Sequence, residues 1–397
     1  MVKVMAVNAG SSSLKFQLFD MPSEKVICNG LVERIGMDMG NFTIKHDGEK
    51  KSVEQPFPDH GVAVDALLKA LISEGIVKEL SEINAVGHRI VQGGAYFADS
   101  AIVDDDVEAK VEELCDLAPL HNPAHLIGYR AFKKALPGVE HVFTFDTAFH
   151  QTMDEASYMY ALPYEYYTKY KVRKYGAHGT SHKYVSEQAI KLLGNPETSK
   201  VIVCHLGNGA SLTAVKNGKC YDTSMGLTPL AGVMMGTRCG TVDPSIMPYL
   251  CEKTGMTPQE MLNVYNKQSG MLGVSGISSD ARDIEAAYNE GNERAILTSN
   301  LYARTVAKYI GAYFVELGGC DAIAFTAGLG ENSSYIRDLC IKECSEALGV
   351  KLDAEKNAIR SDQAREISAA DSAIKVYVIP TNEEVMIARD TVRLLGL

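Results

Sequence analysis

The chain carries one strand–turn–strand pattern twice. In residues 4–18 an apolar run enters the small polar turn Asn-Ala-Gly-Ser-Ser-Ser, and an alternating segment leaves it. Residues 201–215 have the same order around His-Leu-Gly-Asn-Gly, and Gly207 lies about half of the 397-residue chain after Gly10. The apolar runs predict buried strands, and the alternation predicts strands with one buried face. We therefore predict an α/β fold made of two related halves, each opening with a glycine hairpin.

The first turn has the composition of a phosphate-binding loop. Its small side chains would let an anion approach the backbone N–H groups, and a lysine two residues further on adds positive charge. The residues that would meet a phosphate chain are Ser11, Ser12, Ser13 and Lys15. Taken alone, a serine-rich hairpin that binds no ligand explains the same residues.

A second repeated pattern supports the duplication. The apolar segments 142–146 and 322–326 each end at polar residues, as buried strands that reach a ligand site do. No Pro/Ser-rich linker separates the halves, so we expect closely joined domains with a hinge. We predict an N-terminal domain of residues 1–148 plus 384–397 and a nucleotide-binding domain of residues 149–383.

Composition excludes several classes of function. The net charge of −11 argues against nucleic acid as a partner, and no apolar run is long enough to span a membrane. The N-terminus has no signal-peptide pattern. Nine cysteines without a Cys-x-x-Cys pair indicate free thiols and a reducing cytoplasm. Eight tyrosines within residues 157–184 suggest either a base-stacking surface or, in this acidic chain, a domain or subunit interface.

Four charged residues stand out because they follow or interrupt apolar runs. Arg89 and Arg238 lie in glycine-lined apolar segments, where they need either a carboxylate partner or an anionic ligand. Asp146 ends a predicted strand, although a turn or helix cap would also explain it. Glu383 precedes the closing helix, where the helix dipole alone favours a carboxylate.

His178 and His182 have the spacing of metal ligands on a helix, but the sequence between them reads as a helix entry with Thr180 or Ser181 as the cap. We favour His178 as a hydrogen-bond donor to an anion over a zinc site. No Walker motif is present. The strand and Ala-Gly-x-Gly turn of residues 325–332 instead suit a nucleotide ribose or phosphate.

Seven motifs in this order resemble the acetate kinase family over essentially the whole chain. They are Asn8-Ala-Gly-Ser-Ser-Ser-Leu-Lys15, Gly87-His-Arg89, Phe145-Asp146-Thr-Ala-Phe-His150, His178-Gly-Thr-Ser-His182, His205-Leu-Gly-Asn-Gly209, Met235-Gly-Thr-Arg-Cys-Gly240 and Thr381-Asn-Glu-Glu384. The resemblance implies the duplicated ribonuclease-H-like fold of acetate kinases, sugar kinases, actin and heat-shock chaperone ATPases. It also implies a homodimer that uses ATP with Mg²⁺, or Mn²⁺ in its place.

The resemblance also implies roles for individual residues. The metal would be held by Asn8 and Glu383, and the catalytic set would be Asp146, Arg89, His178 and Arg238. The acyl pocket would be formed by Arg89, Val91, Leu120, Pro229 and Ala177. The nucleotide would meet Lys15, Ser11, Ser12, Ser13, His205, Leu206, Gly207, Asn208, Gly209, Asp280, Ala281, Arg282, Gly328, Leu329, Gly330, Glu331 and Asn332.

These residue types suit transfer to a carboxylate. A carboxylic acid is ionised at pH 7, so no base is needed and catalysis rests on alignment and charge neutralisation. We therefore predict reversible in-line transfer from ATP to acetate, giving acetyl phosphate and ADP, with Asp146 orienting Arg89 or metal-bound water. The alternatives are another short acyl acceptor such as propionate, another phosphoryl donor, or an actin-like or chaperone nucleotide switch.

The sequence departs from the family at two positions of interest. Ala177 replaces a common Phe at the acyl pocket, which predicts tolerance of longer acids. Ala281 replaces a Phe found near the adenine in some relatives, which predicts looser nucleotide selectivity. Gln92 stands where many relatives have His, and the sequence offers no interpretation of it.

Overall fold

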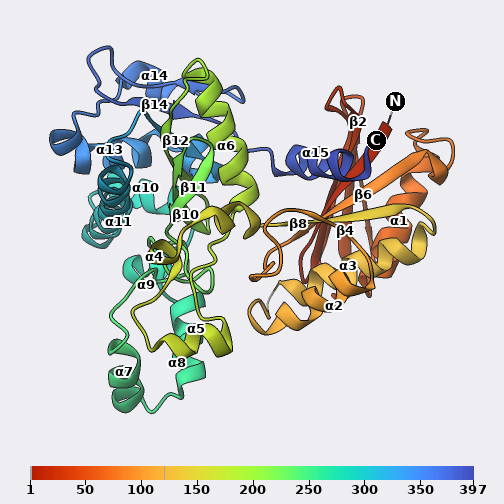
Figure 1. Cartoon of the computed structure of the whole chain (residues 1–397), viewed down its shortest axis with the longest axis horizontal. Coiled ribbons are helices and arrows are strands. Elements are labelled where there is room, and N and C mark those ends of the chain that lie inside the picture. Colours follow the sequence, from red (N-terminus) through yellow and green to blue (C-terminus); the bar gives the residue numbers. More distant parts are fainter. Residues whose placement is uncertain (1, 120) are drawn as a thin grey trace. The chain divides into compact units, whose positions relative to one another are not determined.

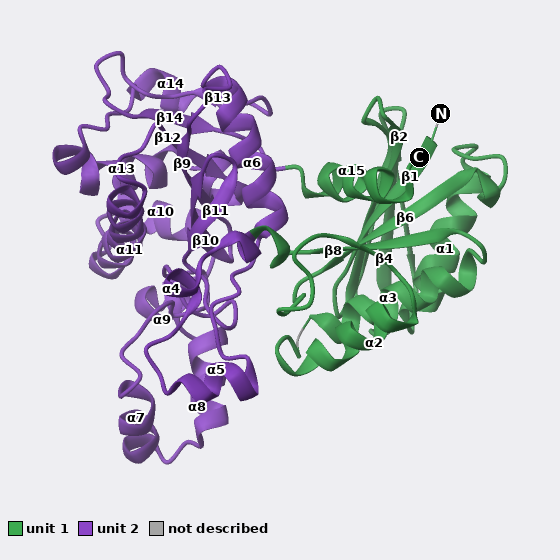
Figure 2. Ribbon diagram, viewed as in Figure 1, with its two compact units in different colours: residues 1–149, 382–397 green, residues 150–381 purple. Residues whose placement is uncertain are grey.

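The computed structural model describes residues 2–119 and 121–397. The chain divides into two compact units, residues 1–149 with 382–397 (unit 1) and residues 150–381 (unit 2) (Figure 2). In the described part of the chain, no helix has both the length and the apolar character that a membrane span requires.

Unit 1 is built on an eight-stranded sheet with the order β5-β4-β3-β2-β1-β6-β8-β7 (Figure 1). The strands are β1 (Val2–Ala9), β2 (Ser13–Met21), β3 (Lys25–Glu33), β4 (Gly40–His46), β5 (Glu49–Gln55), β6 (Ile83–Ile90), β7 (Ala101–Ile102) and β8 (Glu140–Phe145). The helices are α1 (His60–Ser73), α2 (Asp105–Glu113), α3 (Asn122–Ala135) and α15 (Glu383–Leu395).

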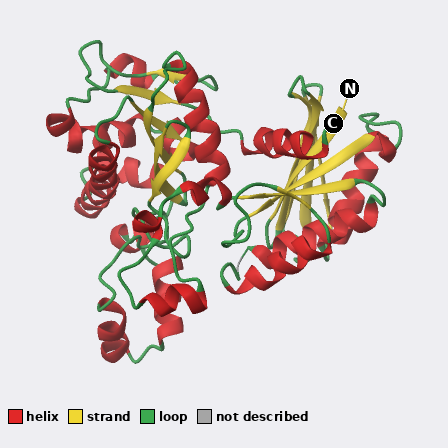
Figure 3. Cartoon of the chain, viewed as in Figure 1, coloured by secondary structure: helices red, strands yellow, loops and turns green. Residues whose placement is uncertain are grey.

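Unit 2 is built on a six-stranded sheet with the order β11-β10-β9-β12-β14-β13 and carries more helices (Figure 3). The strands are β9 (Lys200–Leu206), β10 (Ala210–Lys216), β11 (Lys219–Thr223), β12 (Ala322–Thr326), β13 (Arg365–Glu366) and β14 (Lys375–Val378). The helices are α4 (Glu155–Tyr158), α5 (Tyr164–Tyr170), α6 (Gly179–Leu192), α7 (Ile246–Thr254), α8 (Pro258–Lys267), α9 (Gly270–Ser275), α10 (Ala281–Asn289), α11 (Glu293–Leu317), α12 (Ala327–Asn332), α13 (Ser334–Leu348) and α14 (Ala354–Ala358).

Five strands in each sheet follow the same order and directions. In unit 1 the antiparallel strands β3, β2 and β1 are continued by the parallel strands β6 and β8. In unit 2 the antiparallel strands β11, β10 and β9 are continued by the parallel strands β12 and β14. The glycine turns at Gly10 and Gly207 join the first two strands of each core. This shared order confirms the predicted α/β fold of two related halves.

Burial explains why the first strand of each core is apolar throughout. Residues 4–7 of β1 and 201–206 of β9 are buried on both sides of the strand, because helices cover both faces of each sheet. In unit 1, α1 and α3 share one core cluster with β1 and β2. Helix α15 packs on the other face, where a Cβ on Gly87 would come within 2.5 Å of Ile387. Glycine at position 87 therefore permits the close approach of α15.

The start of α6 differs from the sequence prediction. Thr180 and Ser181 already lie inside the helix, and His178 occupies the N-cap with φ of 59°. The hydroxyl of Ser181 is instead 2.8 Å from His205 Nδ1, so it is engaged in a side-chain contact within the unit. A left-handed backbone at a histidine is uncommon and costs conformational energy, and such strained positions are concentrated at functional sites.

Candidate active site

Unit 1 places an arginine and an aspartate at neighbouring strand ends. Arg89 lies near the end of β6, and Asp146 follows directly after β8, the parallel neighbour of β6. Arg89 Nε donates to Asp146 Oδ1 at 3.0 Å, and its Nη2 donates to Oδ2 at 2.6 Å. The Asp146 side chain is fully buried and that of Arg89 is 19% exposed. The two residues thus form a bidentate ion pair that leaves one edge of the guanidinium near solvent.

Two further carboxylates begin α15 beside this pair. Burial raises the pKa of Glu383 to about 7, Arg89 opposes this shift, and Asp146 and Glu384 add to it. Burial would lower the pKa of Arg89, but the carboxylates of Asp146 and Glu383 raise it overall. Lys15 forms an ion pair with Glu384. The raised pKa of Glu383 thus reflects first its burial, and the nearby cations Arg89 and Lys15 offset this shift only in part.

Asn8 lies across from Lys15 in the antiparallel register of β1 and β2. Its amide oxygen and the Glu383 carboxylate are oxygen donors of the kind that Mg²⁺ binds, and a divalent cation would offset the excess negative charge at the start of α15. The residues present therefore fit the expected ion. Among the residues described, no three His, Cys, Asp or Glu side chains form a ready-made metal site.

The turn between β1 and β2 is tight. The Gly10 N–H donates to Ser13 O at 2.8 Å, and His60 Nε2 lies 2.8 Å from Gly10 O. A Cβ on Gly10 would come within 2.8 Å of Ser13 Oγ. Ser11 at the tip is exposed. The turn thus presents small hydroxyl side chains on a firmly held backbone.

Unit 2 surrounds its own hairpin with donors. A Cβ on Gly209 would lie 3.5 Å from both His178 Nε2 and Arg238 Nη1, so these two side chains flank the turn. The rings of His178 and His205 stack with centroids 4.2 Å apart. Arg238 Nη1 donates to Pro229 O at 3.1 Å and forms no ion pair with a described residue. Burial lowers the pKa of Arg238, and an anion beside it would relieve that cost.

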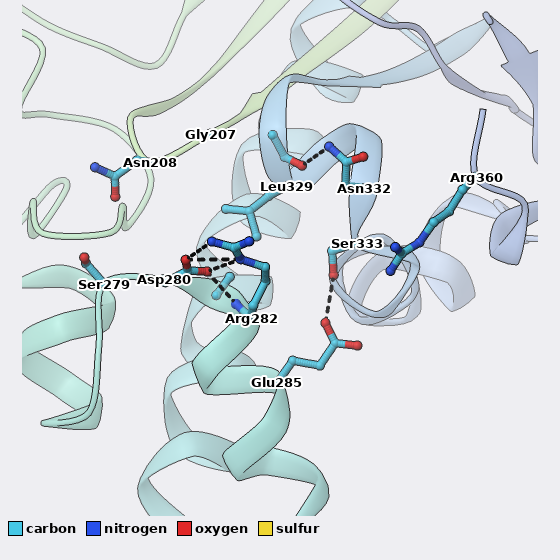
Figure 4. A pocket seen from close by; sticks show the side chains of 12 residues that line it. Gly207, Asn208, Ser279, Asp280, Arg282, Glu285, Leu329, Asn332, Ser333 and Arg360 are labelled. Atoms are coloured by element: carbon cyan, nitrogen blue, oxygen red, sulfur yellow. Dashed lines mark hydrogen bonds and ion pairs between the residues drawn. The ribbon is translucent and has the colours of Figure 1, made fainter. Parts of the chain in front are cut away.

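A cavity of about 620 Å³ begins at the β9–β10 turn (Figure 4). Eight of the predicted nucleotide residues line it, and they come from the β9–β10 turn, the start of α10 and α12. These are Gly207, Asn208, Asp280, Ala281, Arg282, Gly328, Leu329 and Asn332. Asp280 caps α10, and its Oδ2 accepts a hydrogen bond from Arg282 Nη2 at 2.5 Å. The volume suits a nucleotide-sized ligand.

Other predicted nucleotide residues lie away from this cavity. Leu206 is fully buried in the core. The Gly330 carbonyl accepts from Arg337 Nη1 at 2.9 Å, and Glu331 Oε1 accepts from the N–H groups of Ala327 and Thr381 at 2.8 and 3.1 Å. These residues fix the turn after β12. Four cavity residues were missed by the sequence reasoning: Ser279, Glu285, Ser333 and Arg360.

A signal existed for two of the missed residues. Glu285 follows Ala281 by one helical turn, and Ser333 caps α13 directly after Asn332. Ser333 Oγ donates to Glu285 Oε2 at 3.4 Å, so the two face each other across the cavity wall (Figure 4). Arg360 follows the short helix α14 and belongs to no motif, so only the fold brings it to this place.

The predicted acyl-pocket residues fall in different environments. Val91 is buried in unit 1, and Ala177 is only 3% exposed within the core of unit 2. Pro229 contributes the carbonyl that holds Arg238. Leu120 lies outside the described residues. Gln92, which the sequence left uninterpreted, accepts from the Gly94 N–H at 2.9 Å and so braces the glycine turn after β6.

Two related α/β halves, each opening with a phosphate-type hairpin, define the class of actin-like ATPase folds. The model of the Acetokinase family matches residues 3–389, and the chain belongs to this family. It is 56% identical over 398 residues to the acetate kinase of Geobacillus sp. (strain WCH70) and 57% identical over 395 residues to that of Bacillus cereus. These alignments cover 100% of both chains and 99% of both chains, respectively.

Solved structures agree with this membership. A Porphyromonas gingivalis acetate kinase superposes with a TM-score of 0.94 at 45% identity and covers all of both chains. A Francisella tularensis propionate kinase superposes with a TM-score of 0.93 at 41% identity, covering 99% of this chain and 100% of its own. Similarity of this degree over the full length extends to both units.

Proposed function

We propose that this protein transfers the γ-phosphoryl group of ATP to acetate, reversibly, giving acetyl phosphate and ADP. A carboxylate oxygen of acetate forms the new bond to phosphorus as the bond from phosphorus to the β,γ-bridging oxygen breaks. The electron pair of that bond leaves with ADP. No proton has to move, because acetate is ionised at neutral pH.

The Arg89–Asp146 pair is the observation that carries this proposal. Both Asp146 oxygens accept hydrogen bonds from the guanidinium, and the carboxylate is fully buried. A carboxylate held in this way is a poor general base, which a hydroxyl acceptor such as a sugar would need. An acceptor that is already an anion needs no base. It needs a cation in place, and the partly exposed edge of Arg89 provides one.

The remaining residues divide by charge. His178 and Arg238 would stabilise the oxygens of the transferring phosphoryl group, and the cavity beside Gly207 would hold the nucleotide. Asn8 and Glu383 would hold Mg²⁺, with Mn²⁺ as an alternative ion. When bound, this ion supplies neutralising charge to the phosphate oxygens. Lys15 and the serines of the first turn would meet the phosphate chain.

Trapping of the product tests the proposal directly. The protein is incubated with ATP, Mg²⁺ and acetate in the presence of hydroxylamine, which converts acyl phosphates to hydroxamate. We expect hydroxamate to form in step with ADP. Slow release of ADP without hydroxamate would instead favour an actin-like or chaperone nucleotide switch and would overturn the proposal.

The acyl range is a finer question, raised by Ala177 and by the similarity to a propionate kinase. We expect propionate to be used, and we expect Ala177→Phe to lower the ratio of kcat/KM for propionate over acetate. Because Ala177 is buried among core residues, the added ring also costs about 1–3 kcal/mol of stability by overpacking. The ratio is therefore the readout, since a loss of folded protein lowers both values equally. An unchanged ratio would exclude a role in selectivity.

We also propose that the chain forms a homodimer and works in the cytoplasm. All nine cysteines are free thiols, which suits a reducing compartment. In α5, the side chains of Tyr164, Tyr166 and Tyr170 are exposed, and aromatic residues are enriched at protein interfaces. Light scattering on the purified protein should give twice the chain mass of 43.1 kDa. A monomer at all concentrations would exclude the dimer.

A further inference from the structure

Two buried residues connect the core of unit 2 to His178. Ser211 Oγ on β10 lies 2.8 Å from His178 Nδ1 and 2.7 Å from His182 Nε2 on α6. Ser211 and His182 are fully buried. His182 Nδ1 has no hydrogen-bond partner among the described residues. Among the described residues, the Ser211 hydroxyl thus has hydrogen-bond contacts with two imidazoles, one buried and one beside the Gly209 turn.

The hydrogen atoms between His182, Ser211 and His178 can be placed by comparing the free energy that each arrangement costs. Burial, with smaller contributions from His150 and His205, lowers the pKa of His182 far below its ordinary value, so the ring is neutral and carries one N–H. If that hydrogen were on Nδ1, it would be a buried donor without an acceptor, which costs about 1–3 kcal/mol. The hydrogen therefore belongs on Nε2, which donates to Ser211 Oγ.

The same reasoning gives the direction of the Ser211 hydroxyl hydrogen. Ser211 has one hydroxyl hydrogen, and the lone pair of His178 Nδ1 is the remaining acceptor within reach. If His178 Nδ1 carried a hydrogen as well, the serine hydrogen would be buried without an acceptor. The arrangement that pairs every hydrogen runs from His182 through Ser211 to His178 Nδ1.

We propose that His182 and Ser211 are positioning residues that hold neutral His178 as the tautomer with its hydrogen on Nε2. That nitrogen is on the side of the Gly209 turn and of Arg238. In this tautomer His178 offers a donor, and not a lone pair, to an anion at the turn. The catalytic value of this donor rests on the proposed phosphoryl transfer, but the tautomer itself does not.

The test separates the tautomer of His178 from its catalytic value by measuring the tautomer in the absence of substrate. Long-range ¹H–¹⁵N spectra of the ¹⁵N-histidine-labelled protein distinguish nitrogens that carry a hydrogen from those that do not, and His178→Asn assigns the signals. At a pH where His178 is neutral, we expect a bare Nδ1 and a protonated Nε2. In Ser211→Ala the Nδ1 signal should shift toward the protonated form. A protonated Nδ1 in the unaltered protein would overturn the proposal, whatever the activity.

Kinetics then test its use. Ser211→Ala should lower kcat by about two- to tenfold, the value of one hydrogen bond, with little change in the KM for ATP. Ser211→Thr keeps the hydroxyl and should restore both kcat and the Nδ1 signal. His182→Gln keeps a donor near the Nε2 position and should retain more activity than His182→Leu. A tautomer that shifts in Ser211→Ala without loss of kcat would show that His178 is no donor in the reaction.

A matched control lies two residues along the same strand. Thr213 is buried, and its Oγ1 lies 2.9 Å from Thr223 Oγ1. The Thr223 hydroxyl can instead donate a hydrogen bond to Leu212 O. Thr213→Val therefore removes a buried hydroxyl from β10 without touching His178. We expect its spectrum at His178 and its kcat to match the unaltered protein. An equal loss of kcat in Thr213→Val would attribute the Ser211→Ala effect to general disturbance of β10.

Discussion

The β1–β2 hairpin of unit 1 and the β9–β10 hairpin of unit 2 occupy the same position in sheets of the same core topology, yet different side chains flank them. Near the first hairpin, Asp146, Glu383 and Glu384 outnumber the cations Arg89 and Lys15. The second is flanked by His178 and Arg238. Arg89 is paired with a carboxylate, whereas the partners of Arg238 among the described residues are a carbonyl and a thioether.

This difference shows how one duplicated scaffold can serve two ligand chemistries. An excess of carboxylates stabilises a bound cation, and a cluster of donors without carboxylates stabilises a bound anion. The turn backbone provides close approach in both hairpins, and the side chains that later elements bring to it decide the sign of the charge. The Arg89 and Arg238 environments make this difference measurable.

The largest effect should come from breaking the Arg89–Asp146 pair. Arg89→Met leaves the fully buried Asp146 carboxylate without its partner, so we expect stability to fall by about 3–5 kcal/mol. We also expect kcat to fall about 10³-fold or more, because the acceptor loses its cation. Urea unfolding and the hydroxamate assay measure the two losses.

A double variant separates stability from catalysis. Arg89→Met combined with Asp146→Asn removes both charges, so most of the stability should return while kcat stays low. Recovery of activity in the double variant would mean that Arg89 serves only to neutralise Asp146, and the assignment of Arg89 to the acceptor would be wrong.

Arg238→Met should affect catalysis alone. We expect kcat to fall by about 10²–10³-fold, as for the loss of one preorganised donor to a developing charge. Stability should be unchanged or higher, because Arg238 pairs with no carboxylate of the described residues and its burial is costly. Arg304→Met, which removes an exposed arginine of unit 2 that pairs with Glu343, is the control for loss of charge. A stability loss in Arg238→Met as large as that in Arg89→Met would contradict the contrast between the two arginines.

Asn8→Ala tests the cation side. We expect the Mg²⁺ concentration for half-maximal activity to rise about tenfold, a typical cost of weakening a metal site. Stability should fall by less than about 1 kcal/mol, because the Asn8 amide makes no hydrogen bond to a described residue. Asn41→Ala on β4 should leave the Mg²⁺ requirement unchanged. A lower kcat at every Mg²⁺ concentration, with the same half-maximal value, would remove Asn8 from the metal site.

The sequence predicted features that depend on local contacts better than features that depend on tertiary contacts. Strand runs, the hairpin turns and the long helix α11 could be predicted, because apolar periodicity and glycine placement act over a few residues. The contact between Arg89 and Asp146 was predicted only as one of two options, since the sequence expected Asp146 to orient either Arg89 or metal-bound water. The bidentate geometry depends on the pairing of β6 with β8. His178 at the cap of α6 and Arg360 at the cavity were missed for the same reason: tertiary contacts, and not local propensity, place them.

The smallest effect should come from Ala281, the first residue of α10, which is half-buried at the wall of the 620 Å³ cavity. An aromatic ring here would stack on a bound base, and such a contact contributes about 0.5–1.5 kcal/mol. Ala281→Phe should therefore raise the preference for ATP over a pyrimidine triphosphate by about two- to tenfold in kcat/KM, mainly through KM. Ala286→Phe adds the same ring to an exposed position of α10 away from the cavity and should change nothing. If the unaltered protein already rejects every donor except ATP, selectivity comes from other cavity residues and the ring at position 281 adds none.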